Sequence, residues 1–251
     1  MKTILSNILK ISEENKISKP YLVGGIPRDT YLGINTEDSD LDITTNSSDI
    51  IRLALLSCDF FRKYFKVFDD GHITIYSDIY TIDFSSNFVS DSAVKYFGDL
   101  DDEYIKEVYS RDFTINTLHM ELDSNEILDP TGRGKDDIDK KIIKTVASPE
   151  ITLTDDPNRL WRAIELSARL DFDIDQGIID FVKQNKKYFS EHPEIKLSYI
   201  ENIIGKRIKT NPQKILENLI QMNILNLVPL TGEFKKELLK RRMVKDYLDM
   251  L

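Results

Sequence analysis

Cysteine and histidine are scarce in this 251-residue chain, which has one cysteine (Cys58) and three scattered histidines. A single cysteine excludes a disulfide within the chain, and scattered histidines argue against a zinc site. No apolar run approaches the roughly 20 residues that a membrane-spanning helix needs. The N-terminal segment MKTILSNILKISEENK carries polar and acidic side chains too early for a signal peptide. We therefore expect a cytoplasmic protein with no membrane partner.

The composition is that of a soluble globular protein, with 41% hydrophobic and 31% charged residues. The net charge is −9, but residues 193–251 contain eleven Lys or Arg against seven Asp or Glu. An acidic front half suits metal and nucleotide chemistry, and a basic end suits contacts with a phosphate backbone. A lysine-rich helical surface that only keeps the protein soluble explains the same charges equally well.

The hydrophobic pattern changes character along the chain. Its front part alternates short apolar runs with helical segments, and from Thr154 onward the period is helical. We therefore predict an α+β fold, with a mixed α/β domain at residues 1–150 and an all-helical domain at 151–251. The strands expected with clear bounds are Tyr21–Val23, Tyr64–Phe68, His72–Tyr76, Tyr80–Phe84 and Ile142–Val146, and the later helices are Gln176–Asn185, Leu197–Lys209, Pro212–Met222 and Phe234–Met250.

The segment TDDPNRLWRAIELSARL opens the helical part. It predicts a helix capped by Thr154 or Asp155. Asp156, Arg159 and Arg162 then fall three residues apart, on one side of that helix. The same spacing is typical of a ladder of surface ion pairs, each worth only a few tenths of a kcal/mol.

The stretch around which the chain is organised is YLVGGIPRDTYLGINTEDSDLDITTN, residues 21–46. It predicts a strand, a Gly24-Gly25 turn, a short helix and an acidic run that enters a second strand. Side chains two residues apart in a strand point the same way, so Asp38, Asp40 and Asp42 share one face. Two carboxylates beside a glycine turn can hold a divalent cation against a phosphate.

Two further charged residues stand out. Alternation in ITIYSDIYTIDF places Asp83 among apolar neighbours, where a buried carboxylate needs a partner. An Asp83 at a strand end, facing water, is the alternative. Arg111 offers a forked positive charge suited to phosphate, although an ion pair with Asp112 or Glu107 would be the favoured explanation if this segment stood alone.

Four motifs follow one another in a distinctive order: LVGGIPRDTYLG with SDLDITTN, then RDFTINTL, then DPTGRGKDDIDKKIIKTV, then DDPNRLWRA. In this order they resemble the class II CCA-adding enzyme and bacterial poly(A) polymerase family of nucleotidyltransferases. The resemblance covers roughly residues 20–172 and continues more faintly over residues 199–225.

The resemblance implies a nucleotidyltransferase head of the polymerase β-like type, followed by a helical neck and a shortened body. Within the head, Gly24 and Gly25 resemble the turn that cradles the nucleotide phosphates. Arg28 would reach the triphosphate, and Asp29 would brace the turn.

The resemblance also implies a metal site. Asp40 and Asp42 look like the paired carboxylates that hold two Mg²⁺ ions, which lie roughly 3.5–4 Å apart in such sites. The metal pair would activate the RNA 3′ hydroxyl, neutralise charge at the attacked α-phosphate and stabilise the leaving pyrophosphate. Asp83 resembles an acidic residue of the neighbouring strand and is a candidate accessory base.

The remaining implied residues contact the nucleotide. In the second motif these are Arg111, Asp112 and Asn116, which would position triphosphate and ribose. In the last motif Asp156 and Arg159 resemble a template made of amino acids, in which the pair hydrogen-bonds the edge of the base. Arg162 matches a further nucleotide contact.

The chain departs from the family pattern at several points. Counting without gaps from the glycines would make Asp38 and Asp40 the metal pair. The local match of DLDITTN favours Asp40 and Asp42, with two residues inserted before them. Ser110 and Glu165 stand where arginines are usual, and Glu165 reverses a charge close to the nucleotide. The chain is also shorter than typical members.

We therefore expect an enzyme that adds C and A to the 3′ end of tRNA from CTP and ATP. The short C-terminal part and Glu165 favour the alternative of an enzyme that adds only A, or a poly(A) polymerase. A non-catalytic RNA-binding relative and a small antitoxin-like enzyme that modifies proteins are further alternatives. The intact aspartate pair and the base-reading pair argue against these two.

Overall fold

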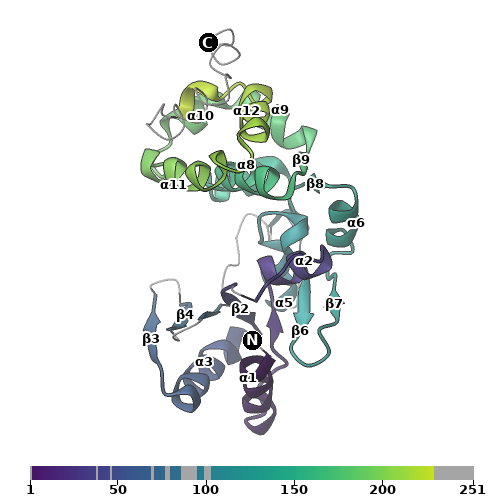
Figure 1. Cartoon of the computed structure of the whole chain (residues 1–251), viewed down its shortest axis with the longest axis vertical. Coiled ribbons are helices and arrows are strands. Elements are labelled where there is room, and N and C mark those ends of the chain that lie inside the picture. The colour runs from purple at the N-terminus through teal and green to yellow at the C-terminus, as the bar shows by residue number, and fades with distance from the viewer. Residues whose placement is uncertain are drawn as a thin grey trace. The chain divides into compact units, whose positions relative to one another are not determined.

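The computed structural model describes residues 2–37, 39–45, 47–68, 71–76, 80–85, 95–98 and 103–228. The chain divides into two compact units, Met1–Ile138 and Asp139–Leu251 (Figure 1). The division into a catalytic domain and a base-reading domain at residue 150 stays a prediction.

The first unit is built on a seven-stranded sheet in the order β3-β4-β5-β2-β1-β6-β7. β2 and β5 are parallel neighbours, and the other pairs are antiparallel. The predicted α+β fold with a small mixed sheet is confirmed. The strands are β1 (Tyr21–Leu22), β2 (Leu41–Thr44), β3 (Tyr64–Val67), β4 (Ile73–Tyr76), β5 (Thr81–Phe84), β6 (His119–Glu121) and β7 (Ile127–Leu128).

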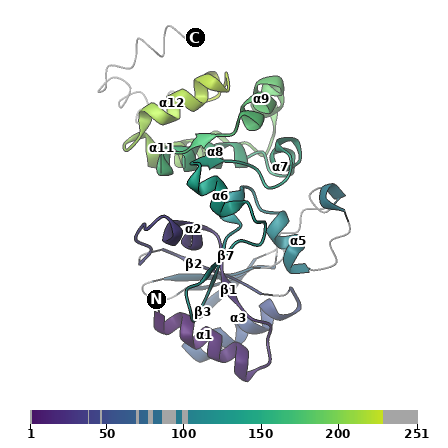
Figure 2. The ribbon, with the colours of Figure 1, turned by 90° about the vertical axis from the view of Figure 1, so that its right-hand side faces the viewer.

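Helices lie on both sides of this sheet. α1 and α3 cover one face, and α2 lies on the opposite side in both views (Figures 1 and 2). The helical elements of this unit are α1 (Lys2–Glu14), α2 (Gly25–Tyr31), α3 (Ser47–Phe61), α5 (Glu103–Tyr109), η1 (Thr114–Asn116) and α6 (Gly134–Asp139), whose last residue belongs to the second unit.

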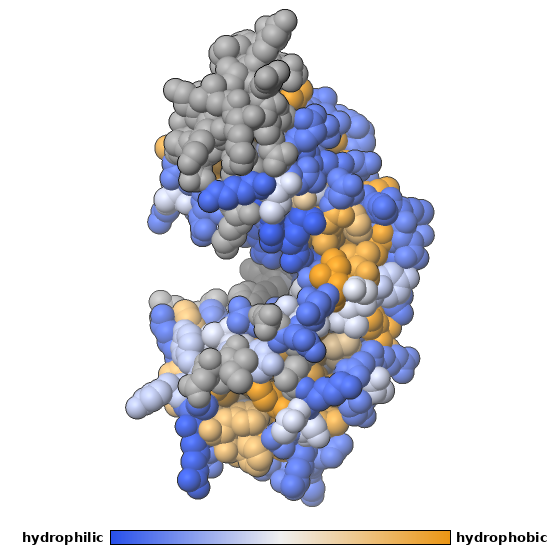
Figure 3. Space-filling view, viewed as in Figure 1, coloured by the Kyte–Doolittle hydropathy of each residue, from blue (hydrophilic) through white to orange (hydrophobic). Residues whose placement is uncertain are grey.

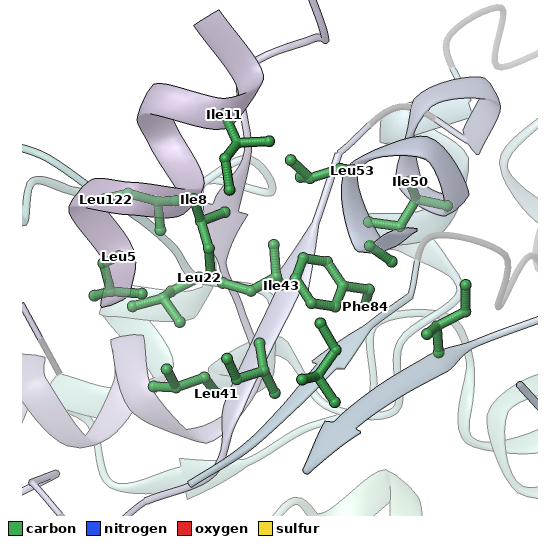
Figure 4. Close-up of a cluster of buried hydrophobic side chains, with 14 of the residues drawn as sticks. Leu5, Ile8, Ile11, Leu22, Leu41, Ile43, Ile50, Leu53, Phe84 and Leu122 are labelled. Atoms are coloured by element: carbon green, nitrogen blue, oxygen red, sulfur yellow. The ribbon is translucent and has the colours of Figure 1, made fainter. Parts of the chain in front are cut away.

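Alternation along the central strands separates a dry face of the sheet from a polar one. The dry face packs against α1 and α3 (Figure 4), and its residues are Leu41, Ile43, Ile73, Ile75, Ile82 and Phe84, none more than 2% exposed. Successive strand residues point to opposite faces. Asp42, Thr74 and Asp83, which lie between these apolar residues, therefore occupy the other face.

The second unit is mostly helical, with one short parallel pair, β8 (Ile142–Ile143) and β9 (Asp173–Ile174). The predicted helices at 176–185, 197–209 and 212–222 are confirmed, and the one at Phe234–Met250 lies outside the described residues. The helices are α7 (Pro149–Asp155), α8 (Arg159–Leu170), α9 (Gln176–Gln184), α10 (Lys186–Glu191), α11 (Leu197–Ile208), α12 (Pro212–Gln221) and η2 (Leu225–Leu227).

The predicted cap at Thr154 or Asp155 is wrong. Helix α7 already begins at Pro149, where the Ser148 side chain accepts a hydrogen bond from the Ile151 amide at 3.2 Å. It ends before Asp156, whose φ of −146° and ψ of 101° are extended. Proline disfavours the helical region for the residue that precedes it, so Pro157 forces the break.

None of the helices in the described part of the chain combines the length and apolar character that crossing a membrane requires. Hydrophobic side chains do gather on the surface over α3 (Figure 3), where Ile51, Leu55 and Phe60 are 44–52% exposed.

The packing of the sheet on α1 and α3 gives a testable expectation. Replacing Phe84, which is 1% exposed, by alanine leaves a cavity in the core. We expect Phe84→Ala to lower the free energy of unfolding by about 3–5 kcal/mol. Urea denaturation measures the loss. The control is Phe60→Ala, because Phe60 is 52% exposed on α3. Equal losses in the two variants would contradict the described core.

Candidate functional site

The glycine turn and the second strand meet closely in the first unit. Gly24 has φ +73° and ψ −127° and precedes α2. A Cβ placed on Gly24 would lie 2.6 Å from Asp42 Oδ2, and the Val23 amide donates to the Asp42 carbonyl at 3.0 Å. The turn therefore packs directly on a carboxylate, and only glycine leaves room for that contact.

Asp40 lies immediately before β2 and is exposed. Its Oδ1 accepts hydrogen bonds from the Thr81 hydroxyl and, at 3.3 Å, from the Thr81 amide. Asp42, two residues on, is partly buried and lies on the same face by strand alternation. Asp38 lies outside the described residues, so its part in the site stays open.

Asp83 is the direct neighbour of Asp42 across the parallel pair of β2 and β5. It is partly buried, and its Oδ1 accepts a hydrogen bond from the Thr74 hydroxyl on β4. The carboxylate thus has the partner that a semi-buried charge needs. This environment favours the interpretation of Asp83 as part of the site over a strand end that faces water.

Asp40 and Asp42 are the candidate metal ligands. Within the described ranges, no group of three or more His, Cys, Asp or Glu side chains could hold a metal ion. Mg²⁺ is commonly bound through one or two carboxylates, with waters and substrate phosphates completing the octahedron. Two aspartates beside a glycine turn fit that donor set, in which protein side chains supply only part of the coordination.

The first and second motifs, 88 residues apart, meet through Arg28 and Asn116. The Arg28 side chain is buried, and it donates to Asp29 Oδ1 at 2.8 Å and to Asn116 Oδ1 at 2.5 Å. Asn116 in turn donates to Asp112 Oδ1 at 2.9 Å. Arg28 Nη2 would lie 3.2 Å from a Cβ on Gly25, so a cation sits against the turn. Its contact with a triphosphate stays a prediction.

Arg111 forms an ion pair with Glu107, which lies four residues earlier on α5, with 2.5 Å between Arg111 Nη2 and Glu107 Oε1. Both side chains are mostly buried, with 16% and 3% exposed. Burial, together with the nearby Arg111 charge, holds the pKa of His119 well below its usual range. Arg111 is thus an anchored cation in the first unit, and its contact with a nucleotide stays a prediction.

In the second unit, the three residues of the expected base-reading face do not all lie on one helix. Asp156 lies in the extended break before α8, where its Oδ1 accepts from the Asn158 amide at 2.9 Å. Arg159 opens α8, and its side chain donates to the Thr152 carbonyl at 3.2 Å. Arg162 is exposed one turn later. Their roles in reading a base stay predictions.

Glu165, the residue that reverses a family charge, has a partner on another helix. Its Oε1 lies 2.6 Å from Arg207 Nε, which joins α8 to α11. Both side chains are mostly buried, at 15% and 28% exposed. The negative charge of Glu165 is therefore balanced locally, by a residue 42 positions along the chain.

Sequence reasoning missed two residues at the site, Thr74 and Thr81. Each donates a hydroxyl hydrogen bond to a candidate carboxylate, Asp83 and Asp40 respectively. Thr74 lies between buried Ile73 and Ile75, and Thr81 precedes buried Ile82, a signal that places both threonines on the polar face. Which aspartate each would meet depends on the register between strands, which alternation alone does not give.

The close approach at Gly24 generates a prediction about metal binding. In Gly24→Ala the new Cβ collides with the Asp42 carboxylate, so we expect Mn²⁺ affinity to fall roughly tenfold or more. Electron paramagnetic resonance of free Mn²⁺ measures the affinity.

The matched control is Gly33→Ala. Gly33 has a similar φ, +72°, but no atom lies within 4 Å of its added Cβ. We expect a stability cost of about 1–2 kcal/mol from the left-handed backbone and unchanged Mn²⁺ affinity. Equal Mn²⁺ affinities in the Gly24 and Gly33 variants would refute the contact with Asp42.

Comparison with known families gives one match that covers the site. Residues 20–144 match the family model described as the poly A polymerase head domain. This range contains the glycine turn, the aspartate pair and the Arg111 motif.

Curated relatives give the same family. The chain is 27% identical over 217 residues to the CCA-adding enzyme of Bacillus subtilis, covering 83% of this chain and 51% of the relative. It is 29% identical over 192 residues to poly(A) polymerase I of Salmonella typhimurium, covering 69% and 39%. The chain thus spans about half the length, or less, of these relatives.

Solved structures share the fold. The Thermotoga maritima CCA-adding enzyme complexed with tRNA-CCA matches with a TM-score of 0.71 at 22% identity, over 90% of this chain and 51% of that one. A CCA-adding enzyme solved with CTP matches with a TM-score of 0.71 at 22% identity, over 90% of this chain and 52% of that one. With its head domain, ordered motifs and fold in agreement, this chain belongs to the CCA-adding enzyme and poly(A) polymerase family of nucleotidyltransferases.

Proposed function

We propose that this chain is a template-independent tRNA nucleotidyltransferase that adds C and A to the tRNA 3′ end from CTP and ATP. The observation that carries the proposal is the packing of the Gly24 turn on Asp42, with Asp40 on the same face of the sheet. A turn that cradles phosphate, held against carboxylates that bind metal, is what nucleotidyl transfer requires.

In this proposal Asp40 and Asp42 hold Mg²⁺ against the nucleotide phosphates. Bound there, Mg²⁺ would lower the pKa of the attacking 3′ hydroxyl and neutralise charge at the α-phosphate and the leaving pyrophosphate. The Thr81 hydrogen bonds orient Asp40. Asp83, held by Thr74, would accept the proton of the hydroxyl.

The buried cations would meet the triphosphate. Arg28 is fixed by Asp29 and Asn116, so little side-chain entropy remains to be lost when a phosphate binds next to the turn. Arg111, braced by Glu107, would supply a second positive charge. Guanidinium groups suit this task because their forked donors match phosphate oxygens.

Choice of the base is assigned to Asp156 and Arg159, with Arg162 as a further contact. A carboxylate accepts from an exocyclic amine, and a guanidinium donates to ring nitrogen or carbonyl. The pairing of Glu165 with Arg207 removes the main reason to expect altered base choice from that residue. This supports addition of both C and A over addition of A alone.

The assay that tests the proposal uses three tRNA substrates, ending before the first C, after one C and after both C residues. Each is incubated with the chain, Mg²⁺ and labelled CTP or ATP. We expect C on the first two substrates and a single A on the third.

Each other outcome has a definite meaning. Use of ATP alone with long products would identify a poly(A) polymerase, and C addition alone a CC-adding enzyme. No incorporation from either nucleotide would overturn the proposed activity altogether.

The metal assignment is tested by Asp40→Asn and Asp42→Asn. Each removes one carboxylate ligand, so we expect incorporation to fall on the order of 10²-fold or more. The control is Asp59→Asn, because Asp59 is exposed near the end of α3, on the other side of the sheet. Full activity in either Asp40 or Asp42 variant would show that the metal ligands are assigned wrongly.

A further inference from the structure

The polar face of the sheet extends beyond the aspartates to the edge strand β3. The pairing of strands aligns Asp42 with Asp83, Asp83 with Thr74, and Thr74 with Lys66. The next row aligns Thr81 with Tyr76, and Tyr76 with Tyr64. Asp40 accepts from Thr81, so this second row starts at a candidate metal ligand.

Two tyrosines of this face are exposed to solvent. Tyr64 on β3 is 89% exposed, and its cross-strand partner Tyr76 on β4 is 44% exposed. The Cβ atoms of directly opposite residues in a sheet lie about 4.5–5.5 Å apart, so the two rings project from neighbouring points of the same face. These two exposed rings do not stabilise the core, because the apolar residues of the core lie on the other face of the sheet.

The edge strand carries one cation, Lys66, and two more, Arg62 and Lys63, precede it in the segment FFRKYFKVF (residues 60–68), which contains no acid. Lys66 lies in the row of Asp42 and Asp83, and its Nζ is 4.1 Å from the centre of the Phe68 ring. Aromatic rings interleaved with cations are the features that bind single-stranded nucleic acid.

The dimensions match a short piece of RNA. Neighbouring strands are about 4.8 Å apart, so Tyr76 and Tyr64 lie roughly 10 and 14 Å from the row position of Asp40. Stacked nucleotides advance about 3.4 Å each along a strand. The distance from the metal ligands to the edge is therefore that of about three to four nucleotides.

We propose that Tyr76 and Tyr64 form a stacking platform for the single-stranded 3′ end of the RNA substrate, with Lys66 contacting its phosphates. The inference rests on the proposed function, because it places the RNA end on the face that bears Asp40 and Asp42. The rings are sequence-tolerant partners, since every base has a π-face. The platform binds the RNA end without choosing the nucleotide that is added.

The test measures the affinity for a fluorescent six-nucleotide RNA with a free 3′ hydroxyl. Binding is monitored by fluorescence anisotropy in the absence of nucleotide and Mg²⁺. We expect Tyr64→Ala and Tyr76→Ala each to weaken binding roughly five- to a hundredfold, the usual effect of losing one stacked base. Tyr64→Phe and Tyr76→Phe keep the ring, so we expect near-normal affinity.

The matched control is Phe65→Ala. Phe65 is an exposed aromatic of the same strand, 46% exposed, but it pairs with buried Ile75 and so lies on the other face. We expect unchanged RNA affinity. A second comparison uses RNA with abasic residues near its 3′ end. We expect the tyrosine variants and the wild type to bind this RNA with equal affinity.

Charge is tested separately with Lys66→Gln. Removing one phosphate contact from a single strand should reduce the slope of log affinity against log salt by roughly 0.7. An unchanged slope would show that Lys66 does not contact the RNA.

The outcomes separate this inference from the proposed function. If the tyrosine variants bind RNA normally while the wild type incorporates C or A, the platform is wrong and the enzymatic assignment stands. If wild-type incorporation fails but RNA binding depends on both rings, the platform stands and the assignment falls. Equal losses in Phe65→Ala and Tyr64→Ala would overturn the face-specific platform.

Discussion

The register of β2 between β1 and β5 is the constraint on which the candidate site depends. Leu41 and Ile43 of β2 are fully buried against α1 and α3. Because side chains alternate, this burial turns Asp40 and Asp42 to the opposite face. A slip of one residue would expose the two apolar side chains and bury two carboxylates, at a cost of many kcal/mol. Packing of the core therefore fixes the chemistry of the other face.

The glycine turn completes the arrangement at the end of β1. Gly24 adopts a backbone conformation reserved for glycine, and its missing Cβ admits the Asp42 carboxylate. Beneath the turn, Arg28 and Asn116 tie it to the RDFTIN segment. The aspartate face, the turn and the buried cation thus depend on one another within the first unit, and the account of nucleotidyl transfer uses all three.

The sequence predicted much of this because the signals were local. Alternation of β-branched and aromatic residues identified the strands that became β3, β4 and β5, and the ordered motifs identified the family. The break between α7 and α8 was misjudged because proline marks both the first turn of a helix and the residue after a break. Partners distant in sequence, such as Glu165 with Arg207, depend on how helices pack, which no local pattern encodes.

The most direct test of the central claim is the position of the metal. Crystals of the chain with Mn²⁺ and a non-hydrolysable CTP analogue would give an anomalous difference peak for manganese. The account predicts a peak within coordination distance of both Asp40 and Asp42, next to the Gly24 turn. A peak coordinated by Asp38 and Asp40, with Asp42 unligated, would contradict the register from which the whole site is built.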